Sequence, residues 1–220
     1  MRVLDLVLPE RCAICACPGR VLCVRCRADL TRLVPPVCER CGSPGPWPVR
    51  RCAECSGRRL GFARARAGIV YDTRARALVR AWKETGRRRI ATEAARLVDE
   101  LLPAPEVECL VPVPGDPERA LRRGDVPSRS LAVELGDRWG VTVRDALERV
   151  HALPRQRGLS LEARRRNARG SVAARSEVPQ AVCVVDDVYT SGATVDACAA
   201  ACRRAGAKRV EVVTFARAVR

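Results

Sequence analysis

Two adjacent carboxylates, Asp186 and Asp187, follow an apolar run over 182–185 and precede a turn of small and hydroxyl residues over 190–194. A turn between a strand and a helix can hold a single phosphate through its backbone N–H groups and hydroxyls. The two carboxylates would repel a bare phosphate, but they accept hydrogen bonds from a vicinal diol. The pattern therefore indicates a ligand with a phosphate at one end and a diol at the other, as in ribose 5-phosphate. The alternative is that one acid ends the strand and the other caps the helix.

The cysteines form the second group of residues with chemical potential. Eight of the thirteen lie in four C-x-x-C pairs within the first 55 residues. Two such pairs joined by a short loop supply the four thiolates of a tetrahedral zinc site, so we predict two structural Zn2+ ions. Consecutive pairs sharing one ion are favoured, and a cross-braced arrangement of alternate pairs is the alternative. Redox-active thiols, or knuckles that have lost their metal, are the interpretation without zinc. The predicted ligands are Cys12, Cys15, Cys23 and Cys26 in the first set, and Cys38, Cys41, Cys52 and Cys55 in the second.

The five other cysteines lack this spacing. Cys17 is interpreted as a spare thiol, unless it takes the place of Cys15. The remaining four lie in segments with strand or helix patterns and are expected to be small buried hydrophobic residues. They are Cys109, Cys183, Cys198 and Cys202.

Composition limits the class of protein. The 220 residues suffice for one or two domains, and the formal net charge is +16, almost all of it from arginine. This charge fits either phosphate-rich partners or an arginine-rich solvated surface. The N-terminal stretch MRVLDLVLPERC is a poor signal peptide, and no run of about 18 apolar residues predicts a membrane span. We expect a cytoplasmic protein, since paired cysteines of this kind suit a reducing compartment.

The texture of the chain changes near residue 60. Residues 1–60 are rich in cysteine and proline and cannot bury enough apolar area to fold without metal, so they are predicted to be a small zinc-binding domain. Residues 61–220 alternate strand and helix patterns, which predicts an α/β domain with a parallel sheet. The charged segment 149–170 is predicted to be a long loop. The expected strands are 67–72, 108–114, 182–187 and 209–219, and the expected helices are 73–84, 88–102, 128–140 and 194–205.

The stretch VVDDVYTSGAT, residues 184–194, closely resembles the phosphoribosyl pyrophosphate (PRPP) signature of type I phosphoribosyltransferases. The whole chain is similar to the ComF family, in which cysteine knuckles precede a phosphoribosyltransferase-like domain. The resemblance implies a type I phosphoribosyltransferase-like parallel sheet flanked by helices, and binding of PRPP together with Mg2+. The strand-end acids would bind the ribose hydroxyls and the turn would hold the 5-phosphate. The residues so implied are Asp186, Asp187, Val188, Tyr189, Thr190, Ser191, Gly192, Ala193 and Thr194.

Three further segments resemble family motifs. LVPVPGDPERALRRG, residues 110–124, is similar to the pyrophosphate-loop region, and PRQRGLSLEARRRN, residues 154–167, is similar to a flexible hood in related transferases. AWKETGRR matches an L-K-x-x-G stretch. The resemblance points to Pro112, Val113, Pro114, Arg119 and Arg123 in the first, to Gln156, Leu159, Arg164 and Asn167 in the second, and to Lys83 in the third.

One motif departs from the family pattern. Many members carry R-G-F-N-Q after the pyrophosphate loop, whereas residues 123–127 here read R-G-D-V-P. The departure bears on catalysis more than on ligand binding, and no catalytic base is assigned; His151, the only histidine, is interpreted as incidental. Two functions stay open. One is a phosphoribosyltransferase acting on an unknown acceptor. The other is a non-catalytic protein that binds single-stranded nucleic acid, since ComF relatives take part in DNA uptake.

Overall fold

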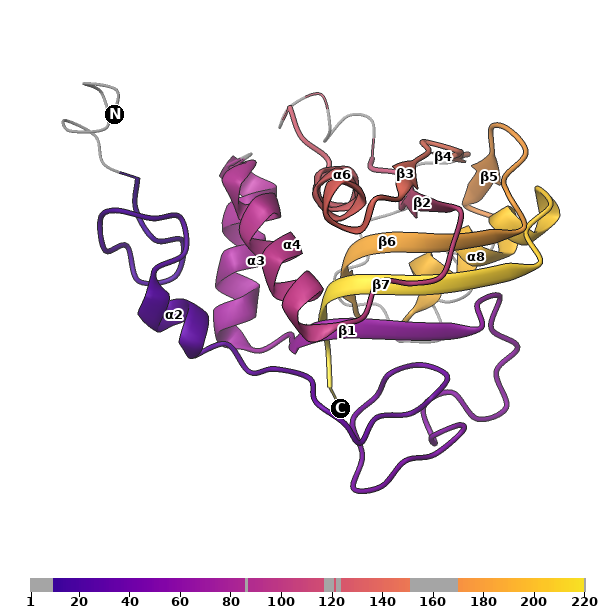
Figure 1. Ribbon diagram of the computed structural model, residues 1–220, viewed down its shortest axis with the longest axis horizontal. Helices are drawn as coiled ribbons and strands as arrows, with labels where there is room; N and C mark the ends of the chain where they lie inside the picture. Colours follow the sequence, from indigo (N-terminus) through magenta and orange to yellow (C-terminus); the bar gives the residue numbers. More distant parts are fainter. Residues whose placement is uncertain (1–9, 86, 117–120, 122–123, 151–169, 220) are drawn as a thin grey trace.

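A computed structural model of the chain describes residues 10–85, 87–116, 121, 124–150 and 170–219. Its main element is a five-stranded sheet in which every neighbouring pair is parallel, in the order β1-β7-β6-β2-β3 (Figure 1). This confirms the predicted α/β class. The strands are β1 Arg64–Val70, β2 Cys109–Pro112, β3 Thr142–Val143, β6 Ala181–Tyr189 and β7 Arg209–Arg217.

Helices cover both faces of the sheet. Helices α3, α4 and α6 share one hydrophobic core with Cys183 and Val185 of β6. Helix α8 shares a second core with Val182 and Val184 on the opposite face, and Figure 1 shows the two layers. The helix bounds are α3 Thr73–Thr85, α4 Arg89–Leu101, α6 Pro127–Trp139 and α8 Ala193–Arg204, close to the expected ranges.

The apolar run 182–185 is the centre of the molecule, as the sequence predicts. All four side chains are fully buried, and β6 pairs with β2 on one side and β7 on the other. A valine strand is stable here because both faces meet a core, and each buried valine contributes about 1.5–3 kcal/mol. The strand continues through Asp186 and Asp187 to Tyr189, so both acids belong to its carboxyl end.

Strand β1 begins three residues earlier than predicted, at Arg64 instead of Ala67. The alternation Arg-Ala-Arg-Ala carries no apolar run, but both arginines find partners. The Arg64 Nε lies 2.7 Å from Glu211 Oε2, and Arg66 donates to the backbone oxygen of Glu39 at 2.9 Å. The alanines between them are buried, so the segment has the period of a strand with one polar side.

A second, antiparallel pair of strands was not predicted. Strand β4 spans Leu147–Arg149 and strand β5 spans Val172–Ala174. Arg149 therefore belongs to a strand, and the prediction of a loop beginning at 149 is wrong at that residue. Strands of three residues carry too little periodicity to be recognised in a sequence. Most of the predicted loop, 151–169, lies outside the described residues.

The cysteine-rich region is largely irregular and contains one short helix, α2 Val24–Ala28. Between its two groups of cysteines the chain runs beside β1, where the backbone N–H of Val70 donates to the oxygen of Thr31 at 2.8 Å. The N–H of Leu33 donates to the oxygen of Gly68 at 2.9 Å. Figure 1 shows the first cysteine group near α3 and the second below β1. Among the described helices, none has the length and apolar character needed to cross a membrane.

Candidate functional site

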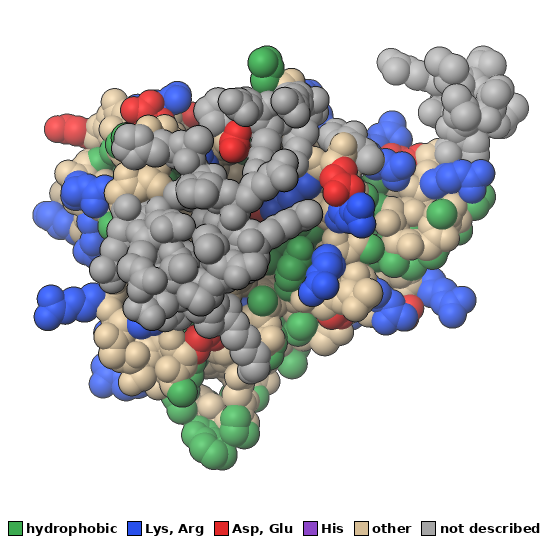
Figure 2. All heavy atoms as spheres, turned by 180° about the vertical axis from the view of Figure 1, so that it is seen from behind, with side chains coloured by type: hydrophobic (Ala, Val, Ile, Leu, Met, Phe, Trp, Pro, Cys, Tyr) green, Lys and Arg blue, Asp and Glu red, His purple; other side chains and the backbone are tan. Residues whose placement is uncertain are grey.

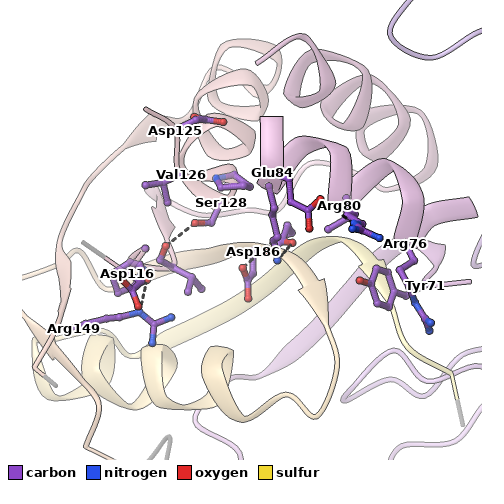
Figure 3. Close-up of a pocket in the computed structure, with 17 residues that line it drawn as sticks. Tyr71, Arg76, Arg80, Glu84, Asp116, Asp125, Val126, Ser128, Arg149 and Asp186 are labelled. Carbon is purple, nitrogen blue, oxygen red and sulfur yellow. Dashed lines mark hydrogen bonds and ion pairs between the residues drawn. The ribbon is translucent and has the colours of Figure 1, made fainter. Parts of the chain in front are cut away.

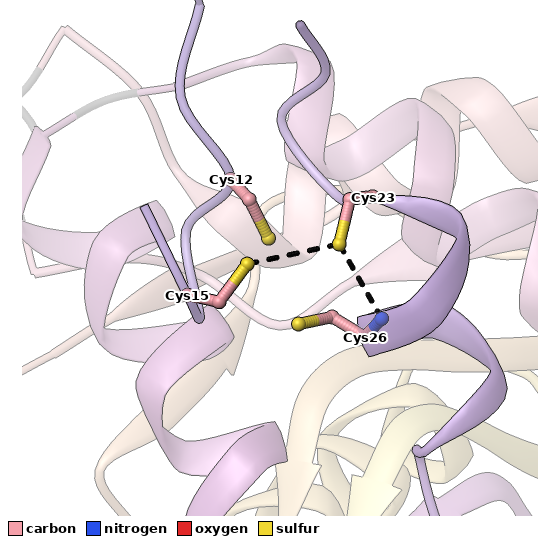
Figure 4. A group of neighbouring side chains, drawn as sticks. All are labelled: Cys12, Cys15, Cys23 and Cys26. Carbon is pink, nitrogen blue, oxygen red and sulfur yellow. Dashed lines mark hydrogen bonds between the residues drawn. The ribbon is translucent and has the colours of Figure 1, made fainter. Parts of the chain in front are cut away.

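The eight predicted ligand cysteines form two groups of four. In each group all four sulfur atoms lie within 4.8 Å of one another. The first cluster contains Cys12, Cys15, Cys23 and Cys26 (Figure 4), and the second cluster contains Cys38, Cys41, Cys52 and Cys55. Consecutive pairs therefore share a site, as favoured, and the cross-braced alternative is wrong. Four converging sulfurs are the donor set of a structural zinc site, so each cluster fits one Zn2+ ion of its own.

Backbone amides support the thiolate form in both clusters. The N–H of Cys26 donates to Cys23 Sγ at 3.4 Å, and that of Cys52 donates to Cys38 Sγ at 3.3 Å. Burial by itself would raise the pKa of Cys38, but backbone N–H groups lower it to about 7. Hydrogen bonds, first from the backbone at Cys17, lower the pKa of Cys15 to about 6. Burial raises the pKa of Cys26 and Cys41 and raises that of Cys55 to about 11. Zinc requires deprotonated thiols, so one or two thiolates form readily in each cluster and a bound cation would stabilise the others.

The remaining cysteines lie outside these clusters, as predicted. Cys17 is not among either set of four, and none of the thirteen cysteines forms a disulfide. Cys109, Cys183, Cys198 and Cys202 are fully buried in the cores. Burial raises the pKa of Cys183 and Cys198, and raises that of Cys202 to about 12, so these thiols stay neutral.

A cavity of about 660 Å³ opens at the carboxyl ends of β2 and β6 (Figure 3). In parallel sheets this edge is where ligands bind. In Figure 3, Asp186 lies between the loop that carries Asp116 and the helix that carries Arg76 and Arg80. The charged lining residues are Arg76, Arg80, Lys83, Glu84, Asp116, Asp125, Arg149, Asp186 and Asp187.

The acid pair meets Lys83 from α3. The Lys83 Nζ forms an ion pair with Asp187 Oδ2, and the Asp187 side chain is 8% exposed. Burial alone would lower the pKa of Lys83, but the charge of Asp187 raises it above its usual value, so this lysine is cationic. Burial, followed by the charge of Asp187, raises the pKa of Asp186 well above its usual range. Asp187 is thus paired with a cation, while Asp186 faces the cavity and forms no ion pair with any of the described residues.

The loop after β2 forms the opposite wall. Val113 and Pro114 line the cavity, whereas Pro112 is buried inside β2. Two side chains fix this loop: Ser128 Oγ donates to the oxygen of Val113 at 2.6 Å, and Arg149 Nε donates to the oxygen of Pro114 at 2.9 Å. The sequence did not identify either residue.

The turn between β6 and α8, residues 190–194, is well formed but does not line this cavity. Gly192 adopts a left-handed φ of +73°, and a Cβ there would lie 2.2 Å from the hydroxyl of Tyr189. Ala193 N–H donates to Ser191 Oγ at 3.3 Å, and α8 begins at Ala193. Tyr189 is buried, and Val188 packs partly buried against the core. The turn is therefore tight at Gly192, as predicted, while the cavity is lined by only the two acids of the implied signature.

Alanine at position 192 is expected to destabilise the protein by about 2–4 kcal/mol, because both the φ and the contact with Tyr189 oppose a Cβ. Gly140→Ala is the matched control, since Gly140 also has a left-handed φ of +65° but nothing lies within 4 Å of its Cβ position. Thermal denaturation of both variants checks this. Equal losses for the two would show that the Tyr189 contact contributes nothing.

Asp125, Val126 and Pro127 stand where many family members carry Phe, Asn and Gln, and the first of them, Asp125, has two side-chain partners. Its carboxylate accepts a hydrogen bond from Trp82 Nε1 at 3.2 Å, and Ser130 Oγ donates to its other oxygen. Pro127 is the first residue of α6. Asp125 thus ties Trp82 of α3 to Ser130 of α6, at the rim of the cavity. The departure has a structural role of its own.

Three basic residues on one face of α3 line the cavity, and sequence reasoning found only Lys83. Arg76, Arg80 and Lys83 are spaced i, i+4 and i+7, which places them on one side of a helix. This spacing is visible in the sequence and could have predicted that the two arginines lie beside Lys83. Arg80 pairs with Glu84 at 2.9 Å, and the Arg76 guanidinium lies 5.7 Å from the ring centre of Tyr71.

Several implied residues lie outside the described part of the chain. These are Arg119 and Arg123 of the pyrophosphate-loop region, and Gln156, Leu159, Arg164 and Asn167 of the hood region; His151 is in the same position. The described residues therefore bring together Lys83, Val113, Pro114, Asp186 and Asp187 at one cavity.

Basic side chains are spread over the surface. On the face in Figure 2, arginine and lysine side chains lie at several separate places around the molecule. The exposed Trp47, 65% accessible, lies close in sequence to the exposed Arg50 and Arg51 in the second half of the cysteine-rich region.

Comparison with known proteins adds names to this geometry. Residues 3–56 match the model of the double zinc ribbon domain. The chain is similar to the "DNA utilization protein YhgH" of Salmonella typhi, with 31% identity over 94% of this chain and 96% of the relative. It is 28% identical to the protein of that name from Escherichia coli, over the same shares. It is 27% identical to "Competence protein F" of Haemophilus influenzae, over 90% of each chain.

Proposed function

Because this chain belongs to the ComF family of competence and DNA utilization proteins, we propose that it acts in the uptake or use of DNA in the cytoplasm. We propose further that residues 61–220 form a phosphoribosyltransferase-like domain that binds PRPP or another ribose 5-phosphate group. Residues 1–60 form the zinc-bearing domain in this proposal. The names of the relatives support the first part, and the cavity supports the second.

The observation that best supports this ligand is the pair Asp186 and Asp187, which ends a buried strand and lines a cavity of about 660 Å³. Carboxylates so placed accept hydrogen bonds from ribose hydroxyls. Lys83 compensates the charge of Asp187, and Arg76 and Arg80 supply positive charge on the same wall for a diphosphate. A purely structural pair of acids would not need to face an open cavity.

Mg2+ is the cation expected to accompany PRPP. The cavity offers oxygen ligands, chiefly Asp186, whose raised pKa reflects burial and a like charge that a cation would offset. When bound with the diphosphate, Mg2+ neutralises charge on the leaving group. The protein's own residues would orient the ribose through Asp186 and Asp187 and hold the diphosphate against α3. The acceptor is not assigned, and binding does not require that transfer takes place.

Calorimetry on the full chain tests the ligand. With Mg2+ present, PRPP is expected to bind with a Kd in the micromolar to submillimolar range, and ribose 5-phosphate more weakly because it lacks the diphosphate. Unphosphorylated ribose is the control and should not bind measurably. Absence of PRPP binding at millimolar concentration would overturn the proposal.

Binding of single-stranded nucleic acid is the second candidate. It is favoured by the net charge of +16 and by the exposed Trp47 with Arg50 and Arg51, since an aromatic ring and nearby cations suit unpaired bases and phosphates. Affinity for an oligonucleotide should then fall steeply as salt increases. An affinity that does not change with salt would contradict this electrostatic account.

A further inference from the structure

The last residue of β7, Arg217, is a buried cation at the junction of the second cluster and the sheet. Its side chain is 1% exposed. Its Nη1 donates to the backbone oxygen of Cys41 at 2.7 Å, and its Nη2 lies 3.8 Å from Cys41 Sγ. The Nη2 also pairs with Glu54 Oε2 at 2.6 Å. Cys41 belongs to the first C-x-x-C pair of the second cluster and Glu54 lies within the second pair, 52–55. One guanidinium therefore contacts both pairs.

The same guanidinium supports the β6–α8 turn, which we define as residues 190–194. Its central carbon lies 4.3 Å from the ring centre of Tyr189, a stacking distance for a cation on an aromatic face. The hydroxyl end of Tyr189 lies against Gly192. Direct contacts therefore link Cys41 to Arg217, Arg217 to Tyr189, and Tyr189 to Gly192 in the middle of the turn.

Two further contacts join the segment after the second cluster to the same place. Arg58 Nη1 donates to the backbone oxygen of Ser191 at 3.4 Å. The N–H of Gly61 donates to Asp196 Oδ1 in the first turn of α8 at 2.7 Å. The turn and the first turn of α8 are thus also held by contacts with Arg58 and Gly61, which follow the second cluster.

We infer that Arg217 is a positioning residue that couples the second cluster to the β6–α8 turn, so that metal in this cluster keeps the turn ordered. The sulfurs of the second cluster fit zinc, and because metal binding at such sites is coupled to folding, losing the metal frees the loops that carry the four cysteines. Cys41 would then no longer hold Arg217, and Tyr189 would lose its stacking partner. This inference rests on the proposed function in one respect: it takes the turn to be part of the ligand site.

Hydrogen exchange of the full chain, measured without PRPP, tests the coupling. Cys52→Ser removes one ligand of the second cluster, and exchange of amides in the turn is expected to rise roughly tenfold. The matched control is Cys15→Ser in the first cluster, which should leave the turn unchanged. If Cys52→Ser loses its zinc and the turn still exchanges as in the wild type, the inference is wrong.

Variants of the linking residues complete the test. Arg217→Met is expected to raise exchange in the turn by a similar factor while the first cluster keeps its zinc. Arg64→Met, which breaks another arginine–glutamate pair with a β7 residue, should not. If Arg217→Met does not fold, Glu54→Gln should give a smaller rise in the same amides; no rise would overturn the role of Arg217. A protein that shows this coupling but does not bind PRPP contradicts the proposed function alone.

Discussion

Replacing Cys41 with serine is expected to reduce bound zinc from two ions per chain to about one and to lower the Tm by about 10 °C. Cys41 is 1% exposed and belongs to a cluster that packs in the same core as β6 and α8. Binding of structural zinc contributes about 10–16 kcal/mol in isolated zinc fingers, so losing even a third of that exceeds most point substitutions. For a chain of this length, each kcal/mol shifts the Tm by about 2–4 °C.

Metal analysis and thermal denaturation on the same samples measure both effects. Cys17→Ser is the matched control, because Cys17 neighbours the first cluster in sequence but is not one of its four sulfurs. It should keep two zinc ions and a wild-type Tm. Two zinc ions in Cys41→Ser, or fewer than one zinc in the wild type, would contradict the assignment of these clusters.

Replacing both Asp186 and Asp187 with asparagine is expected to weaken PRPP binding about 100-fold or more. Each hydrogen bond from a ribose hydroxyl to a carboxylate contributes about 1.5–3 kcal/mol, and asparagine keeps the shape while removing the charge. In Asp187→Asn, Lys83 also loses its partner, so its cation becomes available to a phosphate. Asp186→Asn alone should therefore cost more affinity than Asp187→Asn alone.

Calorimetry with Mg2+ and PRPP measures these differences. Asp145→Asn is the control, since Asp145, like Asp187, is an acid paired with a cation, at 2.9 Å from Arg129, but it does not line the cavity. Its affinity should equal that of the wild type. Unchanged affinity in the double variant would exclude the acid pair from the site.

We also expect the affinity for PRPP to depend on pH. The pKa of Asp186 lies above its usual value, so this group is protonated at a higher pH than an ordinary aspartate. A protonated carboxyl binds Mg2+ and a diol less well, so affinity should fall as pH decreases through the raised pKa and recover above it. Asp186→Asn should abolish this dependence, and a wild-type affinity that is flat with pH would contradict it.

The sequence predicted the parts of the site that a short stretch of chain determines. The valine run and its two acids lie as expected because a strand buried on both faces must be apolar until it reaches the sheet edge. The two cysteine clusters followed from spacing alone, since two knuckles with a short loop can close on one ion.

Other features depend on contacts between distant residues and were not predicted. Ser128 and Arg149 hold the loop after β2 through its backbone oxygens, and nothing in their local sequence signals this. Arg217 is one of many arginines in the sequence, yet it is among the largest fully buried side chains. Its burial depends on partners far away in the sequence, above all on Glu54, 163 residues away, which supplies the opposite charge.

The segment that runs along β1 has a consequence for association between molecules. Strand β1 ends the order of the main sheet, and its outer side would otherwise present free N–H and C=O groups to any extended chain. The N–H groups of Val70 and Ala65 instead donate to the oxygens of Thr31 and Arg40, and the oxygen of Gly68 accepts from Leu33. At the opposite end of the sheet, β3 has only two residues. The cysteine-rich region thus covers the β1 edge against pairing with a second copy of the chain, and among the described strands the opposite edge is too short to serve as a long template.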